Sequence, residues 1–234
     1  MMNVILVGPA GSGKSTFAGE FAKYLARKEY DVKVVNLDPA TDPIYKASKN
    51  LRDFVRTEDV MKRFELGVNG ALLKSMEIAM NRIEDVIAEG DYVIYDTPGQ
   101  MELFLYTDFG EEFVKKLEGF TAGLFLIDSC LATSHEKFAA CLAQAIVVTL
   151  RFSIPFVTIF TKSDVCEALK LEDVKRRISS EGGILSEVLE NFLEFVGVTT
   201  LVQRVVSTSS KTWKGFDEVF GVLHEIFCSC GDVS

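Results

Sequence analysis

Six short runs of apolar, often β-branched residues recur along the chain, and they constrain the possible fold more than any other feature of the sequence. Within each run the apolar residues are nearly continuous rather than alternating, which is typical of parallel strands covered on both faces. The runs are Asn3–Val7, Lys33–Leu37, Tyr92–Tyr95, Gly123–Ile127, Phe156–Phe160 and Arg204–Val206. Segments with helical periodicity separate them, so we predict an α/β fold with three α/β/α layers and a mostly parallel sheet.

One connection is too long for a single crossover helix. More than fifty residues separate the strand that ends near Leu37 from the strand that begins at Tyr92. A crossover needs only about a dozen residues or slightly more. We therefore expect a helical insert at about residues 40–88 within a single domain that spans residues 1–234.

Composition and charge exclude several classes of protein. Hydrophobic residues make up 48% of the chain and charged residues 25%, which indicates a soluble globular protein. The formal net charge of -9 argues against a large basic patch, so no direct binding of nucleic acid is expected. Arg151 and Pro155 divide the apolar stretch from 138 to 160 into a helix and a strand, and the first residues lack the basic region of a signal peptide. No membrane association is expected.

The number and spacing of the cysteines predict the redox state of the protein's compartment. There are five, at positions Cys130, Cys141, Cys166, Cys228 and Cys230. The number is odd and the spacings match no disulfide framework, which favours a reducing, cytoplasmic location. Cys228 and Cys230 could bind a metal with His224, but a buried or frayed helix end is the better interpretation because no second ligand pair follows.

The stretch "GPAGSGKST" matches the phosphate-binding pattern G-x-x-x-x-G-K-[ST] from Gly8 to Ser15. A predicted strand precedes it and an amphipathic helix follows, which is the context that the pattern requires; the alternative is an accidental glycine-rich turn. Backbone amides and the helix N-terminus would surround the phosphates. Lys14 would bind the β- and γ-phosphates, and the Ser15 hydroxyl would bind Mg²⁺. The predicted phosphate-binding residues are Gly11, Ser12, Gly13, Lys14, Ser15 and Thr16.

The stretch "YDTPGQME" follows a buried strand. Asp96 ends that strand, where α/β sheets bind their ligands, and is a candidate for holding Mg²⁺, usually through water. The Gly99 amide is a candidate to contact the γ-phosphate, and Gln100 and Glu102 are candidates to orient or deprotonate the attacking water. The alternative is a simple strand-to-helix turn with an acidic cap.

Asp38, in "NLDPATD", ends the second predicted strand at the same edge of the sheet. It is a candidate for a second carboxylate near Mg²⁺ or for activating water. The alternative is that Asp38 and Pro39 only begin a turn.

Two further elements suggest base recognition. Thr161-Lys162-Ser163-Asp164 resembles the Asn-Lys-x-Asp element of GTPases. Its aspartate would accept hydrogen bonds from guanine N1–H and the 2-amino group, which adenine lacks. The Lys162 stem would pack along the base. The turn Ser209, Ser210 and Lys211 resembles the Ser-Ala-Lys element, in which a backbone amide meets guanine O6.

Taken in order, these motifs resemble the GPN-loop GTPases, a family named for a Gly-Pro-Asn loop inserted in a P-loop GTPase fold. The resemblance covers nearly the whole chain and rests on "GPAGSGKST", "NLDPA", "LRDFV", "LGVNGAL", "DTPGQME", "TKSD" and the Ser-Ser-Lys turn. It implies GTP and GDP as ligands, Mg²⁺ as cofactor, and a constitutive homodimer whose nucleotides face the subunit interface.

By this resemblance, Asn69 would reach the partner subunit's phosphates or attacking water, in the manner of an arginine finger without its charge. The flanking Gly67 and Gly70 would supply positive φ and close approach. The alternative is a glycine-asparagine turn between two insert helices. The chain departs from the family pattern twice: Val68 replaces the proline of the loop, and Thr161 replaces the asparagine of the base element. We expect a less preorganised loop and weaker nucleotide affinity, with guanine selectivity kept by Asp164.

The favoured function is slow, Mg²⁺-dependent GTP hydrolysis that acts as a conformational switch. A second hypothesis is an assembly factor that holds and releases a protein client, because the resemblance links the family to assembly of complexes such as RNA polymerase. The alternatives are a P-loop small-molecule kinase, with Arg176 and Arg177 as lid residues, and a related dimeric ATPase. The ATPase alternative is disfavoured because Pro9 and Ala10 stand where an extra lysine is expected early in its P-loop.

Overall fold

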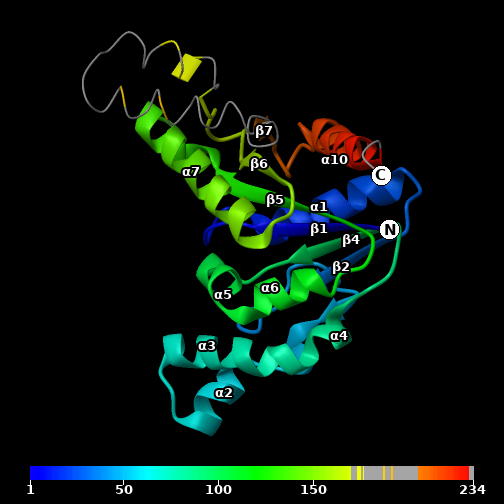
Figure 1. The fold of residues 1–234 in the computed structure, drawn as a ribbon, viewed down its shortest axis with the longest axis vertical. Coiled ribbons are helices and arrows are strands. Elements are labelled where there is room, and N and C mark those ends of the chain that lie inside the picture. Colours follow the sequence, from blue (N-terminus) through cyan, green and yellow to red (C-terminus); the bar gives the residue numbers. More distant parts are fainter. Residues whose placement is uncertain (170–172, 175, 177–186, 188–190, 192–204, 232–234) are drawn as a thin grey trace. The chain divides into compact units, whose positions relative to one another are not determined.

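The computed structural model describes residues 1–169, 173, 174, 176, 187, 191 and 205–231 (Figure 1). It divides into two compact units, Met1–Gly123 and Leu124–Ser234, and each is described here by itself. The predicted single domain stays a prediction. Arg177 and Arg204 lie outside the described residues, as do the side chains of Cys228 and Cys230.

The first unit contains four parallel strands in the order β3-β2-β4-β1. They are β1 (Met2–Val7), β2 (Val32–Asn36), β3 (Lys49–Asn50) and β4 (Tyr92–Asp96). All residues of β1 and β4 are buried, as their continuous apolar pattern predicts. Asp96 at the end of β4 lies opposite Leu6 on one side and Asn36 on the other. The carboxyl ends of these three strands therefore meet at one edge of the sheet.

Helices α1, α5 and α6 position the loops at this edge. Helix α1 (Lys14–Arg27) connects β1 to β2 and buries an aromatic and aliphatic face. Helices α5 (Met101–Leu105) and α6 (Asp108–Lys115) follow β4. A cluster of aromatic rings joins α5 and α6 to β4. Its members are Tyr95, Phe104, Phe109 and Phe113, all of them fully buried.

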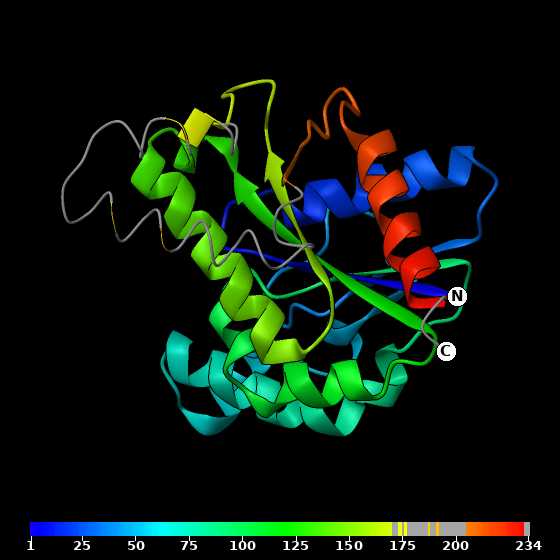
Figure 2. The same cartoon turned by 45° about the horizontal axis from the view of Figure 1, so that its top comes forward.

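The segment between β2 and β4 contains β3 and a series of helices, seen in cyan in Figure 2. The helices are η1 (Leu51–Asp53), α2 (Thr57–Phe64), α3 (Val68–Ala79), η2 (Met80–Arg82) and α4 (Ile83–Val86). The sequence analysis missed β3, because its two residues are polar and only half-buried. Apolar residues recur at helical spacing from Leu72 to Ile83, but they are divided among α3, η2 and α4 rather than lying on one helix.

The second unit contains β5 (Phe120–Asp128, which begins before the boundary), β6 (Phe156–Thr161) and β7 (Val205–Ser207). β6 and β7 pair in parallel. Helix α7 (His135–Phe152) precedes β6, η3 (Ser129–Leu131) follows β5, and α10 (Phe216–Gly231) follows β7. The apolar stretch from 138 to 160 is thus divided into a helix and a strand, as predicted. None of the helices in the described part of the chain combines the length and apolar character needed to cross a bilayer. The predicted α/β class with a mostly parallel sheet is confirmed.

Candidate nucleotide site

The glycine-rich loop after β1 has the backbone that a phosphate cradle needs. Gly11 and Gly13 adopt positive φ, of 78° and 86°. Such angles favour glycine, because other residues lose free energy there. Gly13 also occupies the N-cap of α1, so the first turn of that helix points its free amides toward the loop. The structure therefore places the predicted phosphate-binding residues in one continuous loop and helix start.

Lys14 lies folded back against its own loop. Its Nζ donates to the carbonyl oxygens of Gly8 at 2.7 Å and Pro9 at 3.1 Å, and the residue is only 5% exposed. Burial lowers the pKa of Lys14, while Asp96, Asp38 and Glu102 act in the opposite direction. A lysine held in this way can exchange its two carbonyl partners for phosphate oxygens.

Asp96 is a buried carboxylate, and one of its oxygens has no hydrogen-bond partner among the residues that the structure describes. The residue is 2% exposed, and its Oδ2 accepts a hydrogen bond from the Tyr45 hydroxyl at 2.9 Å. The Ser15 hydroxyl also interacts with the carboxylate. Among the described residues, no donor reaches Oδ1. Burial raises the pKa of Asp96 to about 6, although the bonds from Ser15 and Tyr45 lower it.

These groups fit Mg²⁺. A hard cation takes oxygen ligands and usually keeps several waters, so one carboxylate and one hydroxyl beside a phosphate are enough. Asp96 Oδ1 is an oxygen of this type, and Ser15 lies next to it. In the described part of the chain, no group of three or more His, Cys, Asp or Glu side chains forms a closed metal cage. The protein would therefore share the ion with a phosphate ligand.

Sequence reasoning missed Tyr45. The Tyr45 hydroxyl is the neutral donor to Asp96, since burial raises the pKa of this phenol. Its loop packs against α1, where a Cβ on Gly19 would lie 3.2 Å from the Tyr45 Cβ. A small residue at position 19 thus allows the tyrosine to approach the metal site. An aromatic residue shortly after the Asp38 loop is a weak signal, and only the fold shows its partner.

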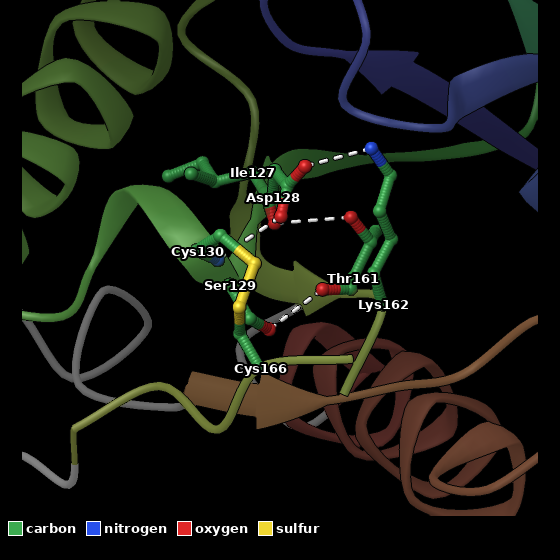
Figure 3. Close-up of a disulfide and its surroundings, with 7 residues drawn as sticks. All are labelled: Ile127, Asp128, Ser129, Cys130, Thr161, Lys162 and Cys166. Carbon is green, nitrogen blue, oxygen red and sulfur yellow. Dashed lines mark hydrogen bonds and ion pairs between the residues drawn. A yellow bond between two sulfur atoms is a disulfide. The ribbon is translucent and has the colours of Figure 1, made fainter. Parts of the chain in front are cut away.

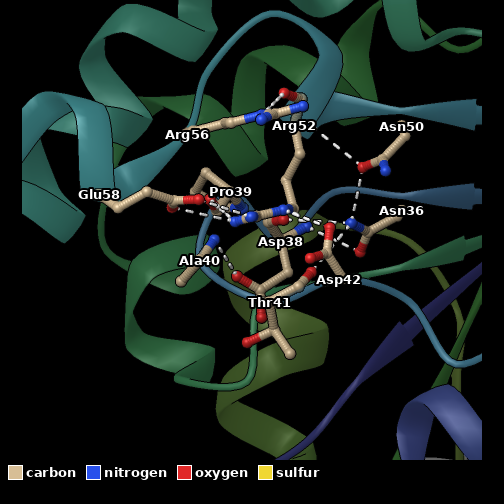
Figure 4. Close-up of polar contacts among 10 residues, drawn as sticks. All are labelled: Asn36, Asp38, Pro39, Ala40, Thr41, Asp42, Asn50, Arg52, Arg56 and Glu58. Atoms are coloured by element: carbon tan, nitrogen blue, oxygen red, sulfur yellow. Dashed lines mark hydrogen bonds and ion pairs between the residues drawn. The ribbon is translucent and has the colours of Figure 1, made fainter.

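Asp38 and Gly99 come together at the same edge of the sheet. The Gly99 amide donates to Asp38 Oδ2 at 3.2 Å, and the Ala40 amide donates to Oδ1 at 2.8 Å (Figure 4 shows the Asp38 loop). The Asn36 side chain accepts from the Asp38 amide and donates to the Asp38 carbonyl. The Gly99 amide, which is predicted to contact a γ-phosphate, is therefore already hydrogen-bonded to the Asp38 carboxylate.

Gln100 and Glu102 lie at the start of α5, and both are exposed. Gln100 is the N-cap, and Glu102 lies in the first turn. Glu102 belongs to the same electrostatic cluster as Asp38 and Asp96, because it raises the pKa of Lys14. The structure thus places Glu102 close enough to Lys14, in the glycine-rich loop, to interact with its charge. Which of these groups handles water stays a prediction.

The loop with Asn69 corrects one expectation. Gly67 is the N-cap of α3 with a φ of -68°, and Gly70 lies within α3, so neither glycine supplies positive φ. The chain changes direction instead at Glu65, which is the C-cap of α2 and has a left-handed φ of 52°. The expected positive φ at the glycines is therefore wrong, because the chain turns before it reaches them. Their predicted role in close approach to a ligand stays a prediction. Asn69 itself is exposed in the first turn of α3.

Thr161 closes the base-recognition loop at the end of β6. Its hydroxyl donates to the Ile127 carbonyl at 3.1 Å, and its own carbonyl accepts from the Ser129 hydroxyl at 2.6 Å (Figure 3). Thr161 is 2% exposed. Lys162 follows with a φ of 59°, and its Nζ pairs with Asp128 Oδ2 at 2.7 Å. Threonine thus fixes the loop to the end of β5 with its single hydroxyl.

The two predicted base elements are in direct contact. The buried Ser209 hydroxyl donates to Asp164 Oδ1 at 2.7 Å. This hydrogen bond lowers the pKa of the exposed Asp164 carboxyl, and Lys211 acts in the same direction. Ser210 is half-buried beside them. Gly215, with a φ of 80°, closes the turn, because a side chain there would collide with the Ser207 carbonyl.

A disulfide between Cys130 and Cys166 overturns the cysteine prediction. The two residues are 36 positions apart, and their Cα atoms lie 5.2 Å apart (Figure 3). They meet because one follows β5 and the other ends the loop after β6, a proximity that spacing in the sequence does not reveal. The inference of a reducing compartment from unpaired cysteines therefore loses its basis. Cys141 is a free, buried cysteine.

The lid residues of the kinase alternative gain no support. Arg176 pairs with Asp173 three residues earlier, and its side chain is 79% exposed. This is the arrangement of a solvated helix face.

Comparison with known proteins finds a matching family and named relatives. Residues 6–229 match the model of a family described as conserved hypothetical ATP binding protein. The chain is 28% identical over 251 residues to GPN-loop GTPase PAB0955 of Pyrococcus abyssi, with both chains fully covered. It is 30% identical over 238 residues to GPN-loop GTPase 3 of Dictyostelium discoideum, covering 98% of this chain and 78% of that protein.

A solved structure shows the same fold. The nucleotide-free GTPase PAB0955 from Pyrococcus abyssi superposes with a TM-score of 0.85 over 98% of each chain, at 28% identity. The family description names ATP, whereas the named relatives are GTPases. The chain belongs to the GPN-loop GTPase family.

Proposed function

We propose that the protein binds GTP with Mg²⁺ and hydrolyses it to GDP and phosphate. The observation that carries this proposal is the meeting of Lys14, Ser15 and the partly unpaired Asp96 at the glycine-rich loop. Such a group of one cation, one hydroxyl and one buried carboxylate suits a metal-bound polyphosphate.

Each group has a distinct task in phosphoryl transfer. Lys14 leaves the Gly8 and Pro9 carbonyls to bind the β- and γ-phosphates. Ser15 and Asp96 hold Mg²⁺, with Tyr45 fixing the orientation of the carboxylate. When bound, the ion neutralises charge on the phosphate oxygens. Because little covalent chemistry falls to the protein in this reaction, catalysis depends on positioning and electrostatics.

The bond between Asp38 and the Gly99 amide suggests how GTP is sensed. A γ-phosphate that takes the Gly99 amide must displace the Asp38 carboxylate from it. The released carboxylate is then available for the attacking water or the solvation shell of Mg²⁺. Gln100 and Glu102 are the other candidates for positioning the water. Loss of the γ-phosphate would restore the bond to Asp38, which gives the switch two states.

Asp164 accounts for the choice of base. The Asp164 carboxylate is exposed, and the Ser209 hydroxyl donates to its Oδ1 and fixes its orientation. An ionised carboxylate accepts from guanine N1–H and the 2-amino group, whereas adenine offers neither donor. We therefore propose GTP rather than ATP as the nucleotide.

We further propose a homodimer in which Asn69 acts on the partner subunit's nucleotide, and a protein client such as RNA polymerase assembly machinery. These proposals rest on the family resemblance. Two features of the single chain support the proposed dimer. A Cβ on Gly67 would meet nothing within 4 Å, so no packing within the chain requires glycine there. Val68 and Leu73, beside Asn69 on α3, are exposed by 58% and 51%. Exposed apolar residues grouped in this way suit contact with another protein surface.

Phosphate release from GTP, measured in parallel with ATP, tests the proposal. Wild-type protein should hydrolyse GTP and not ATP. Asn69→Ala should lose about tenfold or more in turnover, the scale of one transition-state donor. Asn81→Ala, another exposed asparagine of the insert, is the matched control and should behave as wild type. Mixed dimers of Asn69→Ala and Lys14→Ala subunits would then show whether Asn69 acts across the interface. Preference for ATP would reject the role given to Asp164.

A further inference from the structure

Arg52 is a buried charge beside the Asp38 loop that the proposed reaction does not use. Its side chain is only 8% exposed, and it lies in η1, directly after β3. Arginine is almost never so buried unless its charge is paired. The groups that pair with the Arg52 guanidinium therefore show which part of the chain Arg52 holds in place.

The guanidinium binds three groups at once. Nε donates to Asp42 Oδ1 at 2.7 Å, and Nη1 donates to the Pro39 carbonyl at 2.9 Å (Figure 4). Nη1 and Nη2 also bind the two carboxylate oxygens of Glu58, at 3.2 and 2.7 Å. The Glu58 bond raises the pKa of Arg52, and Arg52 in turn lowers the pKa of Glu58. One side chain thus connects both ends of the segment Pro39–Asp42 to the first turn of α2.

This segment begins directly after Asp38. The Pro39 carbonyl accepts a second hydrogen bond from the Thr57 amide at 3.0 Å, also at the start of α2. The Thr57 hydroxyl in turn accepts from Ser75 of α3, at 3.2 Å. Asp38 is therefore attached on its carboxyl side to the helical insert, and Arg52 makes most of that attachment.

We propose that Arg52 is a positioning residue that holds the Asp38 carboxylate in place by fixing the Pro39–Asp42 segment to α2. This inference rests on the proposed role of Asp38 in GTP hydrolysis. Lysine cannot replace Arg52, because a single ammonium does not reproduce the planar fork that binds Glu58 through two nitrogens while also reaching Pro39 and Asp42. A displacement of about 1 Å at a reacting group can cost on the order of a hundredfold in rate.

The test is a double-mutant cycle of Arg52→Lys with Asp38→Ala. Single-turnover GTP hydrolysis and the Kd of a fluorescent GDP analogue are measured for wild type, both single variants and the double variant. Arg52→Lys should lower the hydrolysis rate roughly tenfold to a hundredfold. The Kd for GDP should stay within about twofold of wild type, because Arg52 does not contact the residues proposed to bind GDP. In the Asp38→Ala background, Arg52→Lys should cause no further loss, since residues that act through one another are not additive.

A second readout does not depend on activity. In the nucleotide-free protein, the Gly99 amide should exchange its hydrogen several times faster in Arg52→Lys than in wild type, because its bond to Asp38 is loosened. Arg82→Lys is the matched control, since Arg82 makes an exposed pair with Asp85. It should change neither rate nor exchange. If Arg52→Lys fails to fold, Glu58→Gln replaces it in the same cycle and removes the charge that orients the guanidinium.

The outcomes are separable. An Arg52→Lys protein that hydrolyses GTP at the wild-type rate overturns the positioning role. The positioning role is also overturned if Arg52→Lys lowers the hydrolysis rate by the same factor in the wild-type and Asp38→Ala backgrounds. Arg52 would then act independently of Asp38. A wild-type rate in the Asp38→Ala single variant instead rejects the proposed role of Asp38, on which the inference rests.

Discussion

Asp96 ends one buried strand and Asp164 follows another, yet their surroundings are opposite. Asp96 is 2% exposed, and burial raises its pKa to about 6. Asp164 is exposed, and a hydrogen bond from Ser209 lowers its pKa. The first carboxylate has an unpaired buried oxygen that a cation can satisfy, whereas the second is an ionised acceptor open to a ligand. In the function proposed above, one residue type would thus serve as a metal ligand in the first unit and as a base reader in the second.

The largest effect is expected from Asp96→Asn. The amide keeps the shape but removes the charge that Mg²⁺ requires, so the rate of GTP hydrolysis should fall by about 10²-fold to 10³-fold. Because burial disfavours the ionised carboxylate, the nucleotide-free variant should at the same time unfold less readily, by about 1 to 3 kcal/mol at neutral pH. Phosphate release and chemical denaturation without nucleotide measure the two effects.

The control for Asp96→Asn is Asp91→Asn, an exposed aspartate just before the same strand. A variant that loses both activity and stability would show that the charge at position 96 is satisfied in the nucleotide-free protein, which contradicts the contrast drawn here.

Asp164→Asn should have the next largest effect, on binding rather than chemistry. The amide presents a donor where guanine also has donors, so the affinity for GTP should fall by about ten- to a hundredfold. Affinity for xanthosine triphosphate should rise, because xanthine carries a carbonyl in place of the 2-amino group. Fluorescence titration with both nucleotides measures this. Asp173→Asn, at an exposed pair in the same unit, is the matched control. Unchanged GTP affinity would show that Asp164 does not read the base.

The phosphate side could be predicted from sequence almost completely. A short motif fixes Gly11, Gly13 and Lys14 by local geometry, and strand ends place Asp38 and Asp96 at the same edge. The position of the two predicted base elements also follows from the sequence, because Asp164 and Ser209 each come after one of two paired strands; their role in base recognition stays a prediction.

What the sequence did not reveal depends on contacts between distant residues. Tyr45 reaches Asp96 across 51 positions, and Cys130 meets Cys166 across 36. The wrong expectation of positive φ at Gly67 and Gly70 has a different cause. Residue types alone suggested a turn at the glycines, but α2 ends at Glu65, which takes the left-handed conformation despite its side chain. Helix boundaries decide which residue makes the turn, and composition locates them poorly.

The smallest effect is expected from Ser209→Ala, which refines the contrast between the two carboxylates. Loss of the donor should raise the pKa of Asp164 toward its ordinary value of 3.8 in the nucleotide-free protein. A carboxyl group with a lowered pKa stabilises the fold above its unfolded-state pKa, and this contribution disappears as the pH falls through the folded-state pKa. The variant should therefore lack most of this contribution at neutral pH, whereas wild type loses it only as the pH falls through the lowered pKa of Asp164. At pH 7 the carboxylate stays ionised in both proteins, so GTP affinity should change by less than about threefold, the scale of a weak neutral hydrogen bond.

NMR titration of the Asp164 carboxyl carbon measures the shift in its pKa, with Ser210→Ala as the control. An unchanged titration midpoint in Ser209→Ala would mean that Ser209 does not set the pKa of Asp164, and that exposure alone separates the two carboxylates.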